Sequence, residues 1–394
     1  MRRVPIVERG DWRAQAAECG FRFHTIGGER YWDERAYYAF TLRQIEDDIE
    51  AASDELHAMA MDLLDEIVAR EALMQQLAIP EPYRDWIAQS WRRREGHLYG
   101  RLDLAYDGHG PAKLYELNYD TPTSLFEAAF FQWQWLEDQR ETGRLPADAD
   151  QFNSIHEALV ARFGELAAQL PPPFCLAAVR DSEEDRGTVA YLHDCAAQAG
   201  LHGQMLAIED IGLSADGRFT RLDDTVIGTL FKLYPLEDLM ADAYGCALPG
   251  SGLRLLEPPW KALLSNKGIL PLLWDRHRGH PNLLEAHFAA PDSPLPPGWV
   301  RKPLHSREGA NVALHLADGR HVESDGPYAG PCIQQAAHPL PAFDGRYPLV
   351  GSWIIGDAAC GIGIREDDGP ITRDSACFMP HAIVEDVARG TLHA

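Results

Sequence analysis

The chain places charged and amide side chains two residues apart in two neighbouring segments. Arg101 and Asp103 are separated by one residue, as are Glu116 and Asn118. Residues i and i+2 of a β-strand lie on the same face, so each pair shares a face if both segments are strands. Two carboxylates and an amide oxygen that converge form an all-oxygen site suited to Mg2+ shared with phosphates. On spacing alone, polar residues on the solvated side of a hairpin are the alternative interpretation.

The segments that carry these residues have the pattern of a hairpin. Apolar and polar residues alternate on both sides of DGHGP, residues 107–111, which is rich in turn formers. This pattern predicts a β-hairpin over residues 97–120. Thr121 and Pro122 then predict the N-cap and first position of an aromatic-rich helix, SLFEAAFFQWQWLED. Its tryptophans, Trp133 and Trp135, suit either a core or an interface.

Two further stretches near the C-terminus carry cations. RKPLHSREGANVAL, residues 301–314, places basic residues on a predicted strand that is followed by a loop of small residues. Free backbone N–H groups in such a loop can close over a polyphosphate, although an ordinary surface turn has the same composition. GSWIIGDAACGIGIRED, residues 351–367, predicts two strands ending on Arg365 and Glu366. Such strands deliver an arginine to an anion, or Arg365 pairs with Glu366 or Asp367 at the surface.

The rest of the chain indicates how these stretches are positioned. Apolar residues at helical spacing predict one long amphipathic helix over residues 42–77. Residues 153–274 alternate between helix and strand, which predicts an α/β layer with a parallel sheet. We expect three units, residues 1–150, 151–275 and 276–394, the last rich in strands and glycine.

Composition excludes several classes of protein. The 394 residues include 60 Asp+Glu against 36 Lys+Arg, a net charge of -24. This charge argues against a nucleic-acid partner and against an anionic membrane surface. No signal peptide or spanning apolar run is visible. Seven cysteines without a C-x-x-C pair argue against zinc fingers and a disulfide framework, so we expect a cytoplasmic protein.

Several blocks of the sequence resemble one known family. They are YELNYDTPTSLFEAAFFQWQWLED, LFKLYPLEDLM, EPPWKALLSNKGILPLLW, RKPLHSREGAN and GSWIIGDAACGIGIRED through PHAIVED. Their composition and order are similar to those of the glutathionylspermidine synthetase family of ATP-grasp ligases. The resemblance implies an α/β (α+β) ATP-grasp fold in permuted order, with an inserted α/β domain of the pre-ATP-grasp type.

The resemblance implies a role for each candidate residue. Asp103, Glu116 and Asn118 would hold Mg2+, and Arg101 with Arg365 would grip an acyl phosphate. The residues expected to contact ATP are Lys267, Lys302, Ser306, Gly309, Ala310, Asn311, Gln334 and Gln335. Only one of the two adjacent glutamines should face inward, and the sequence does not indicate which. Lys267 has a second interpretation, in which it satisfies the C-terminal end of a short helix.

The function implied is an ATP-dependent ligase that joins a carboxylate to an amine through an acyl phosphate. The expected substrates are a glutathione- or peptide-like acid and a polyamine-like amine. Glu183 and Glu184 are candidates for binding the amine, although acids in a first helical turn also complement the helix dipole. The alternative is a protein on the same fold that binds or hydrolyses ATP without ligation. We expect no amidase activity, because no amidase-like Cys/His framework precedes the synthetase blocks. The exact substrates and the oligomeric state stay open.

Overall fold

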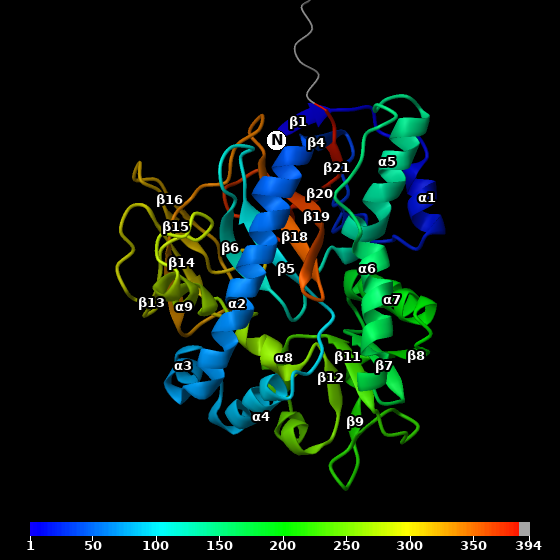
Figure 1. Cartoon of the computed structure of the whole chain (residues 1–394), viewed down its shortest axis with the longest axis vertical. Coiled ribbons are helices and arrows are strands. Elements are labelled where there is room, and N and C mark those ends of the chain that lie inside the picture. The colour runs from blue at the N-terminus through cyan, green and yellow to red at the C-terminus, as the bar shows by residue number, and fades with distance from the viewer. Residues whose placement is uncertain (386–394) are drawn as a thin grey trace, which may run out of the picture.

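The protein is described by a computed structural model that covers residues 1–385, and its centre is a five-stranded antiparallel sheet (Figure 1). The strand order is β20-β19-β18-β5-β6, so the predicted hairpin pairs with strands that lie more than 200 residues further along the chain. The strands are β5 (Tyr99–Ala105), β6 (Lys113–Asn118), β18 (Tyr347–Ile355), β19 (Ala358–Asp367) and β20 (Cys377–Met379). The hairpin and the two late strands predicted from the sequence are both present.

One face of this sheet is apolar. Leu102 and Leu104 of β5 are fully buried and belong to a large core that also contains Leu56 and Leu63 of the long helix α2 (Ala51–Ala69). Because side chains alternate along a strand, Arg101 and Asp103 must project from the other face. A one-residue slip would turn the leucines out of the core, so the core fixes which side chains line the site.

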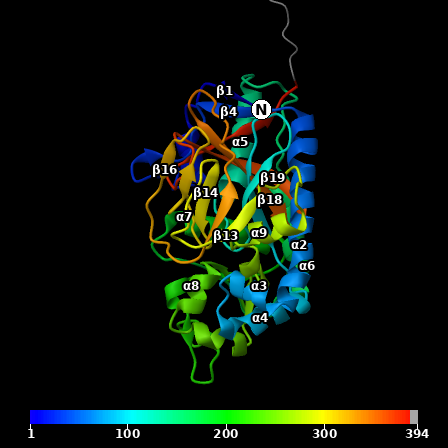
Figure 2. The same cartoon turned by 90° about the vertical axis from the view of Figure 1, so that its left-hand side faces the viewer.

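A second antiparallel sheet faces the hairpin. Its order is β13-β17-β14-β15-β16, and Lys302 on β14 is paired with Ile333 on β17. The strands are β13 (Ala286–Ala289), β14 (Trp299–Pro303), β15 (Ala313–His315), β16 (His321–Glu323) and β17 (Cys332–Ala336). Figure 2 shows this sheet toward the viewer, with the parallel layer below it.

The α/β layer predicted between residues 153 and 274 is a parallel sheet of order β12-β11-β7-β8. Its strands are β7 (Phe174–Ala178), β8 (Gly203–Ala207), β11 (Thr229–Leu233) and β12 (Arg254–Leu256). Its helices are α6 (Ile155–Leu166), α7 (Glu183–Gln198) and α8 (Leu236–Ala241), and its short pieces are β9 (Gly212–Leu213), β10 (Phe219–Thr220), η3 (Ala167–Gln169), η4 (Ile208–Asp210), η5 (Gly245–Gly250) and η6 (Pro259–Leu263).

The prediction of a single helix over residues 42–77 is wrong. The segment forms η1 (Gln44–Glu50), α2 and α3 (Glu71–Gln76), with a break at Arg70, where φ is -126° and ψ is 100°. No glycine or proline lies there. The turn instead lets Leu73 and Met74 enter the core beside α4 (Glu81–Arg92) and α9 (Ile269–Arg276). Tertiary packing therefore overrides the helical periodicity of the segment.

The prediction that a helix starts at Thr121 and Pro122 is also wrong. Residues 121–124 stay non-helical and Ser124 has a φ of 68°. Helical structure then includes the π-helix η2 (Glu127–Phe131) and α5 (Gln132–Glu141). The non-helical turn has a role in the site, since the carbonyl oxygen of Thr123 accepts a hydrogen bond from Arg101 at 2.8 Å.

The two ends of the described chain meet in a small sheet of order β1-β4-β21. The remaining elements are β1 (Arg2–Pro5), α1 (Trp12–Glu18), β2 (Thr25–Ile26), β3 (Glu29–Arg30), β4 (Ala36–Phe40) and β21 (His381–Ile383). Within residues 1–385 the cysteines are all free thiols, and no helix has the length and hydropathy needed to span a membrane. The proposed division into three units stays a prediction.

A buried ion pair joins the hairpin to the parallel layer. Lys232 on β11 donates to Asp120 at 2.5 Å, and the other carboxylate oxygen of Asp120 accepts from the backbone N–H of Leu236 at 2.8 Å. Both side chains are almost fully inaccessible to solvent. The pair therefore fixes the end of strand β6 against helix α8.

We expect Lys232→Met to destabilise the fold by about 3–5 kcal/mol, because it leaves a buried carboxylate without its counter-ion. Urea unfolding measures this change. The double variant Asp120→Asn/Lys232→Met removes both charges and should recover most of the loss. A single variant as stable as the wild type would contradict the assignment of this pair as a structural tie.

Candidate active site

The four hairpin residues meet as their spacing predicts. Arg101 lies opposite Asn118 and Asp103 opposite Glu116 in the β5–β6 register. The amide nitrogen of Asn118 donates to Asp103 at 3.0 Å and to Glu116 at 3.3 Å. Rotation of that amide by half a turn would present its oxygen beside the two carboxylates. Three oxygen donors fit Mg2+ that keeps several waters and shares phosphates, rather than a cation enclosed by protein ligands.

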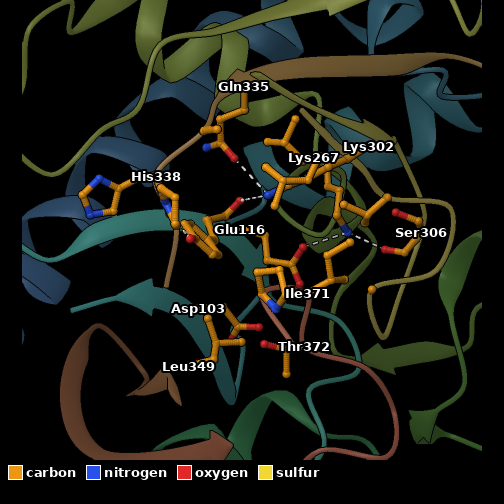
Figure 3. Close-up of a pocket in the computed structure, with 18 of the residues that line it drawn as sticks. Asp103, Glu116, Lys267, Lys302, Ser306, Gln335, His338, Leu349, Ile371 and Thr372 are labelled. Carbon is orange, nitrogen blue, oxygen red and sulfur yellow. Dashed lines mark hydrogen bonds and ion pairs between the residues drawn. The ribbon is translucent and has the colours of Figure 1, made fainter. Parts of the chain in front are cut away.

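Two buried lysines face these carboxylates from other parts of the chain. The ammonium of Lys267 lies 3.0 Å from a carboxylate oxygen of Glu116 and also donates to the carbonyl oxygen of Ser306. Lys302 on β14 donates to the side-chain oxygen of Gln335 at 2.9 Å and to the carbonyl oxygen of Tyr115 at 3.1 Å. Figure 3 shows both lysines beside Glu116. Lys267 therefore belongs to the site and is not a cap for a short helix.

Burial and charge act on the two carboxylates in different ways. Burial would raise the pKa of Glu116, but the charges of Lys267 and Lys302 lower it to about 2. Burial also raises the pKa of Asp103, and the neighbouring Arg101 only partly opposes this. Burial lowers the pKa of Lys302 to about 8. The site therefore holds mutually neutralised charges in place before any ligand arrives.

Two cavities join at this cluster. One, of about 100 Å³, has apolar walls formed by Val300, Val312, Leu314 and Ile371. The other, of about 210 Å³, is polar and reaches Arg101, Asn118 and Arg365. Both cavities are lined by Asp103, Glu116, Lys267, Ser306 and Gly309. An apolar slot that opens onto a charged cleft suits a ligand with a flat apolar head and an anionic tail.

The predicted lid is only partly directed at the cavities. Ser306 is buried and, like Gly309, lines both of them, whereas Ala310 and Asn311 line neither. The side-chain oxygen of Asn311 accepts a hydrogen bond from the backbone N–H of Tyr328 at 2.7 Å and so stabilises the loop itself. Gly309 has a φ of 68°, and a Cβ there would lie 2.5 Å from the carbonyl oxygen of Thr372. Glycine is therefore required where the loop meets the 370–372 segment.

The adjacent glutamines point to opposite faces of β17. Gln335 is 1% exposed, lines the apolar cavity and contacts Lys302. Gln334 instead donates to the carbonyl oxygen of Pro294 at 2.8 Å, on the exposed side. Of the pair, only the side chain of Gln335 faces the site, so the assignment of the Gln334 side chain to the ligand site is wrong.

The two predicted arginines lie together at the far end of the polar cleft. Arg101 donates to Asp103 at 2.7 Å, and Arg365 donates to the carbonyl oxygens of Arg373 and Asp374 at 2.9 Å. The Nε of Arg365 is buried and has no hydrogen-bond partner among the described residues. The surface pairing considered for Arg365 does not occur there, because Glu366 is paired with Arg3 and Asp367 with Arg373. The Nε of Arg365 can therefore donate to an anion in the cleft, whereas Arg101 is already paired with Asp103 and with the carbonyl oxygen of Thr123.

Only part of the acidic cluster approaches the cleft. Glu183 is exposed and lines neither cavity, whereas Asp185, which the sequence analysis did not select, lines the polar cleft. Burial, followed by the charge of Glu127, raises the pKa of Glu184 to about 8. Glu184, like Glu183, lines neither cavity, so Asp185 is the acid of this cluster that borders the cleft, and roles for Glu183 and Glu184 stay predictions.

Glu127 is a residue that sequence reasoning missed. It is fully buried on η2, and burial raises its pKa to about 7, with the charges of Arg365 and Arg101 opposing the shift. It lies within an aromatic-rich segment whose composition is typical of a protein core, so neither its residue type nor its spacing indicated a functional role. A buried carboxyl group near two arginines and Glu184 is typical of a functional site.

The comparisons with known proteins identify the family. Residues 3–384 match the family model described as "Glutathionylspermidine synthase preATP-grasp". The chain belongs to this family. It is 41% identical to a Haemophilus influenzae protein named "Putative acid--amine ligase", over 98% of this chain and 100% of that protein.

More distant relatives are longer than this chain. It is 28% identical to trypanothione synthetase of Crithidia fasciculata and 24% identical to the bifunctional glutathionylspermidine synthetase/amidase of Escherichia coli. The matches cover 82% and 90% of this chain but 53% and 60% of those proteins. A glutathione synthetase-like effector of Globodera pallida superposes with a TM-score of 0.58 at 10% identity, over 97% of this chain and 99% of the effector. That superposition supports the predicted ATP-grasp fold, and the family assignment agrees with it.

Glu127→Gln should make the fold more stable at pH 8 than the wild type, by up to about 3 kcal/mol. Because the folded pKa of about 7 exceeds the ordinary value of 4.5, the carboxyl group contributes its full stability below pH 4.5 and loses it as the pH rises to 7. Glutamine keeps the shape and stays neutral. Thermal unfolding from pH 4 to pH 8 measures the difference, which should vanish at the acid end. The exposed Glu137 provides the control Glu137→Gln, and equal pH slopes for all three proteins would contradict a raised pKa.

Proposed function

We propose that the protein is an ATP-dependent carboxylate–amine ligase that forms an amide through an acyl phosphate. The family and the relatives indicate an amine–acid ligase of the glutathionylspermidine synthetase type. The observation that carries the proposal is the junction of the two cavities at Asp103, Glu116 and Lys267. A nucleotide has the apolar base and the polyanionic tail that this junction accommodates.

Each part of the site has a role in the proposed binding of ATP. The apolar walls and Gln335 take the base, and Lys267 and Lys302 neutralise the phosphates. Asp103, Glu116 and Asn118 would hold Mg2+, which would neutralise part of the charge of the phosphates. Ser306 and Gly309 close the loop over the phosphates and exclude water that would hydrolyse a reactive intermediate.

The proposed reaction takes place beside Arg101 and Arg365. These arginines bind the acid and stabilise the negative charge that develops as the γ-phosphoryl group is transferred to it. The neutral form of the amine then attacks the acyl carbon. The new C–N bond forms, the bond from carbon to the phosphate oxygen breaks, and phosphate leaves with the electron pair and takes up the proton that the nitrogen loses. Asp185, which lines the polar cleft, supplies negative charge beside a cationic amine. Glu184, whose pKa is raised to about 8, holds a proton there near neutral pH. Glutathione-like acids and polyamine-like amines are the substrates to test first.

The first experiment measures phosphate release from ATP and Mg2+ across a panel of acids and amines, with glutathione and spermidine included. We expect release that requires both an acid and an amine, and an amide product of the matching mass. Hydroxylamine in place of the amine should trap the acyl phosphate as a hydroxamate. Release that is independent of acid and amine would instead favour the ATP-hydrolysing alternative. Hydrolysis of the amide product, assayed in parallel, tests the prediction that amidase activity is absent.

The adjacent glutamines provide a matched pair for testing the nucleotide site. Gln335→Ala should weaken binding of a non-hydrolysable ATP analogue about tenfold, because Lys302 loses its side-chain partner, a change of about 1.4 kcal/mol. Gln334→Ala, one residue away on the other face, should leave the affinity unchanged. Isothermal titration calorimetry with Mg2+ present measures both. Equal effects of the two substitutions would place the nucleotide elsewhere.

A further inference from the structure

A larger cleft lies away from the proposed active site. It has a volume of about 850 Å³ and lies between η2–α5 on one side and α6–α7 on the other. It shares no lining residue with either of the cavities that join at Glu116. Its volume lies within the range of small-molecule sites, about 300–1,000 Å³. The cleft is therefore large enough for a small ligand.

Aromatic side chains form one wall of the cleft. The rings of Phe126 and Phe130 lie 5.4 Å apart, and Tyr191 of α7 contacts Phe126 edge-on at 5.6 Å. Trp133 also lines the cleft and is half-buried, whereas Trp135 is fully buried in the core. Of the two tryptophans that the sequence left between core and interface, Trp133 is thus the one that presents its ring to a cleft.

The charge of the cleft has one sign. Glu157 on α6 and Asp194 on α7 are exposed residues of its lining, and the lining includes no lysine or arginine. The ion pairs formed within residues 1–385 include neither carboxylate. Asp194 accepts only a neutral donor, Gln198, at 2.8 Å. A positively charged ligand would meet two carboxylates that have no competing cation.

The polar groups deeper in the cleft are also arranged to accept a donor. The side-chain oxygen of Asn153 is buried and has no hydrogen-bond partner among the described residues, while its nitrogen donates to the carbonyl oxygen of Ala129 at 3.3 Å. His156 is held in position by Tyr191 at 2.9 Å and by Gln198 at 3.3 Å. A free acceptor inside an aromatic cleft suits an N–H donor.

We propose that this cleft binds a small organic ammonium ion with a hydrocarbon body. The hydrocarbon body packs on Phe126, Phe130 and Trp133, whose large aromatic side chains bury apolar surface. The charged nitrogen is attracted to the rim that carries Glu157 and Asp194. This site is independent of the ligase proposal, because it uses none of the residues assigned to ATP, the acid or the amine.

Calorimetric titration with three probes of one shape tests the proposal: 4-phenylbutylammonium, 4-phenylbutanol and 4-phenylbutyrate. We expect the cation to bind one site at least tenfold more tightly than the alcohol, and the anion to bind least. The double variant Glu157→Gln/Asp194→Asn should reduce the affinity for the cation to that for the alcohol and leave the affinity for the alcohol unchanged. Glu137→Gln, which removes an exposed charge of α5 outside the cleft, should alter neither affinity.

The aromatic wall is tested separately. Trp133→Ala should reduce the affinity for the cation and the affinity for the alcohol alike, by at least fivefold. Trp133→Phe should retain most of the wild-type affinity. Thermal unfolding of each variant checks that the fold is intact. Equal binding of cation and anion, or cation binding that the double variant leaves unchanged, would overturn the proposal. A dimer that is dissociated by Trp133→Ala and binds none of the probes would also overturn it, by showing that a second copy covers the cleft.

Discussion

The ion pair between Glu116 and Lys267 is the interaction on which the site depends. A buried ammonium without a counter-ion is strongly destabilising, and the same holds for a buried carboxylate. Here Lys267 lies 3.0 Å from Glu116, and Lys302 adds a second positive charge that acts on the same carboxylate. The pair allows charges of both signs to stay buried at one point before a ligand binds. A polyanion with its cation can then replace the internal partners without creating an unpaired charge.

This pairing requires segments that are distant in the chain to meet with little freedom. β5 and β6 supply the carboxylates, the segment after η6 supplies Lys267, and β14 supplies Lys302. β18 orients the hairpin, since Gly351 lies opposite Asp103 and a Cβ there would come within 2.8 Å of the Arg101 side chain. Glycine at this position therefore leaves space for the side chain of Arg101. The fold and the site therefore depend on the same strand register, because the register that buries Leu102 and Leu104 also places the side chains of Arg101 and Asp103 in the site.

Local periodicity was sufficient to predict some of this arrangement. The period of two in the hairpin correctly predicted that Asp103, Glu116 and Asn118 converge, and the alternation over residues 153–274 correctly predicted a parallel sheet. The same reasoning failed where tertiary packing decided the outcome. The break at Arg70 has no local signal, and the choice between Gln334 and Gln335 depends on how β17 lies between β13 and β14. Glu127 was missed because a lone acid in an aromatic helix shows its environment only after the chain has folded.

The distribution of charge separates two kinds of ligand. The whole chain carries a net charge of -24, which repels polyanions at long range and attracts cations. Such fields are screened within about 8 Å at physiological salt, so binding is decided by the charges inside each cleft. Around Glu116 the lysines and arginines reverse the sign locally and make an anion acceptable. Toward Asp185, which lines the same polar cleft, the sign returns to negative. The proposed ligase, which would hold a phosphorylated acid and a cationic amine side by side, would need this reversal over a short distance. Buried charged side chains are the means by which a strongly acidic protein can provide it.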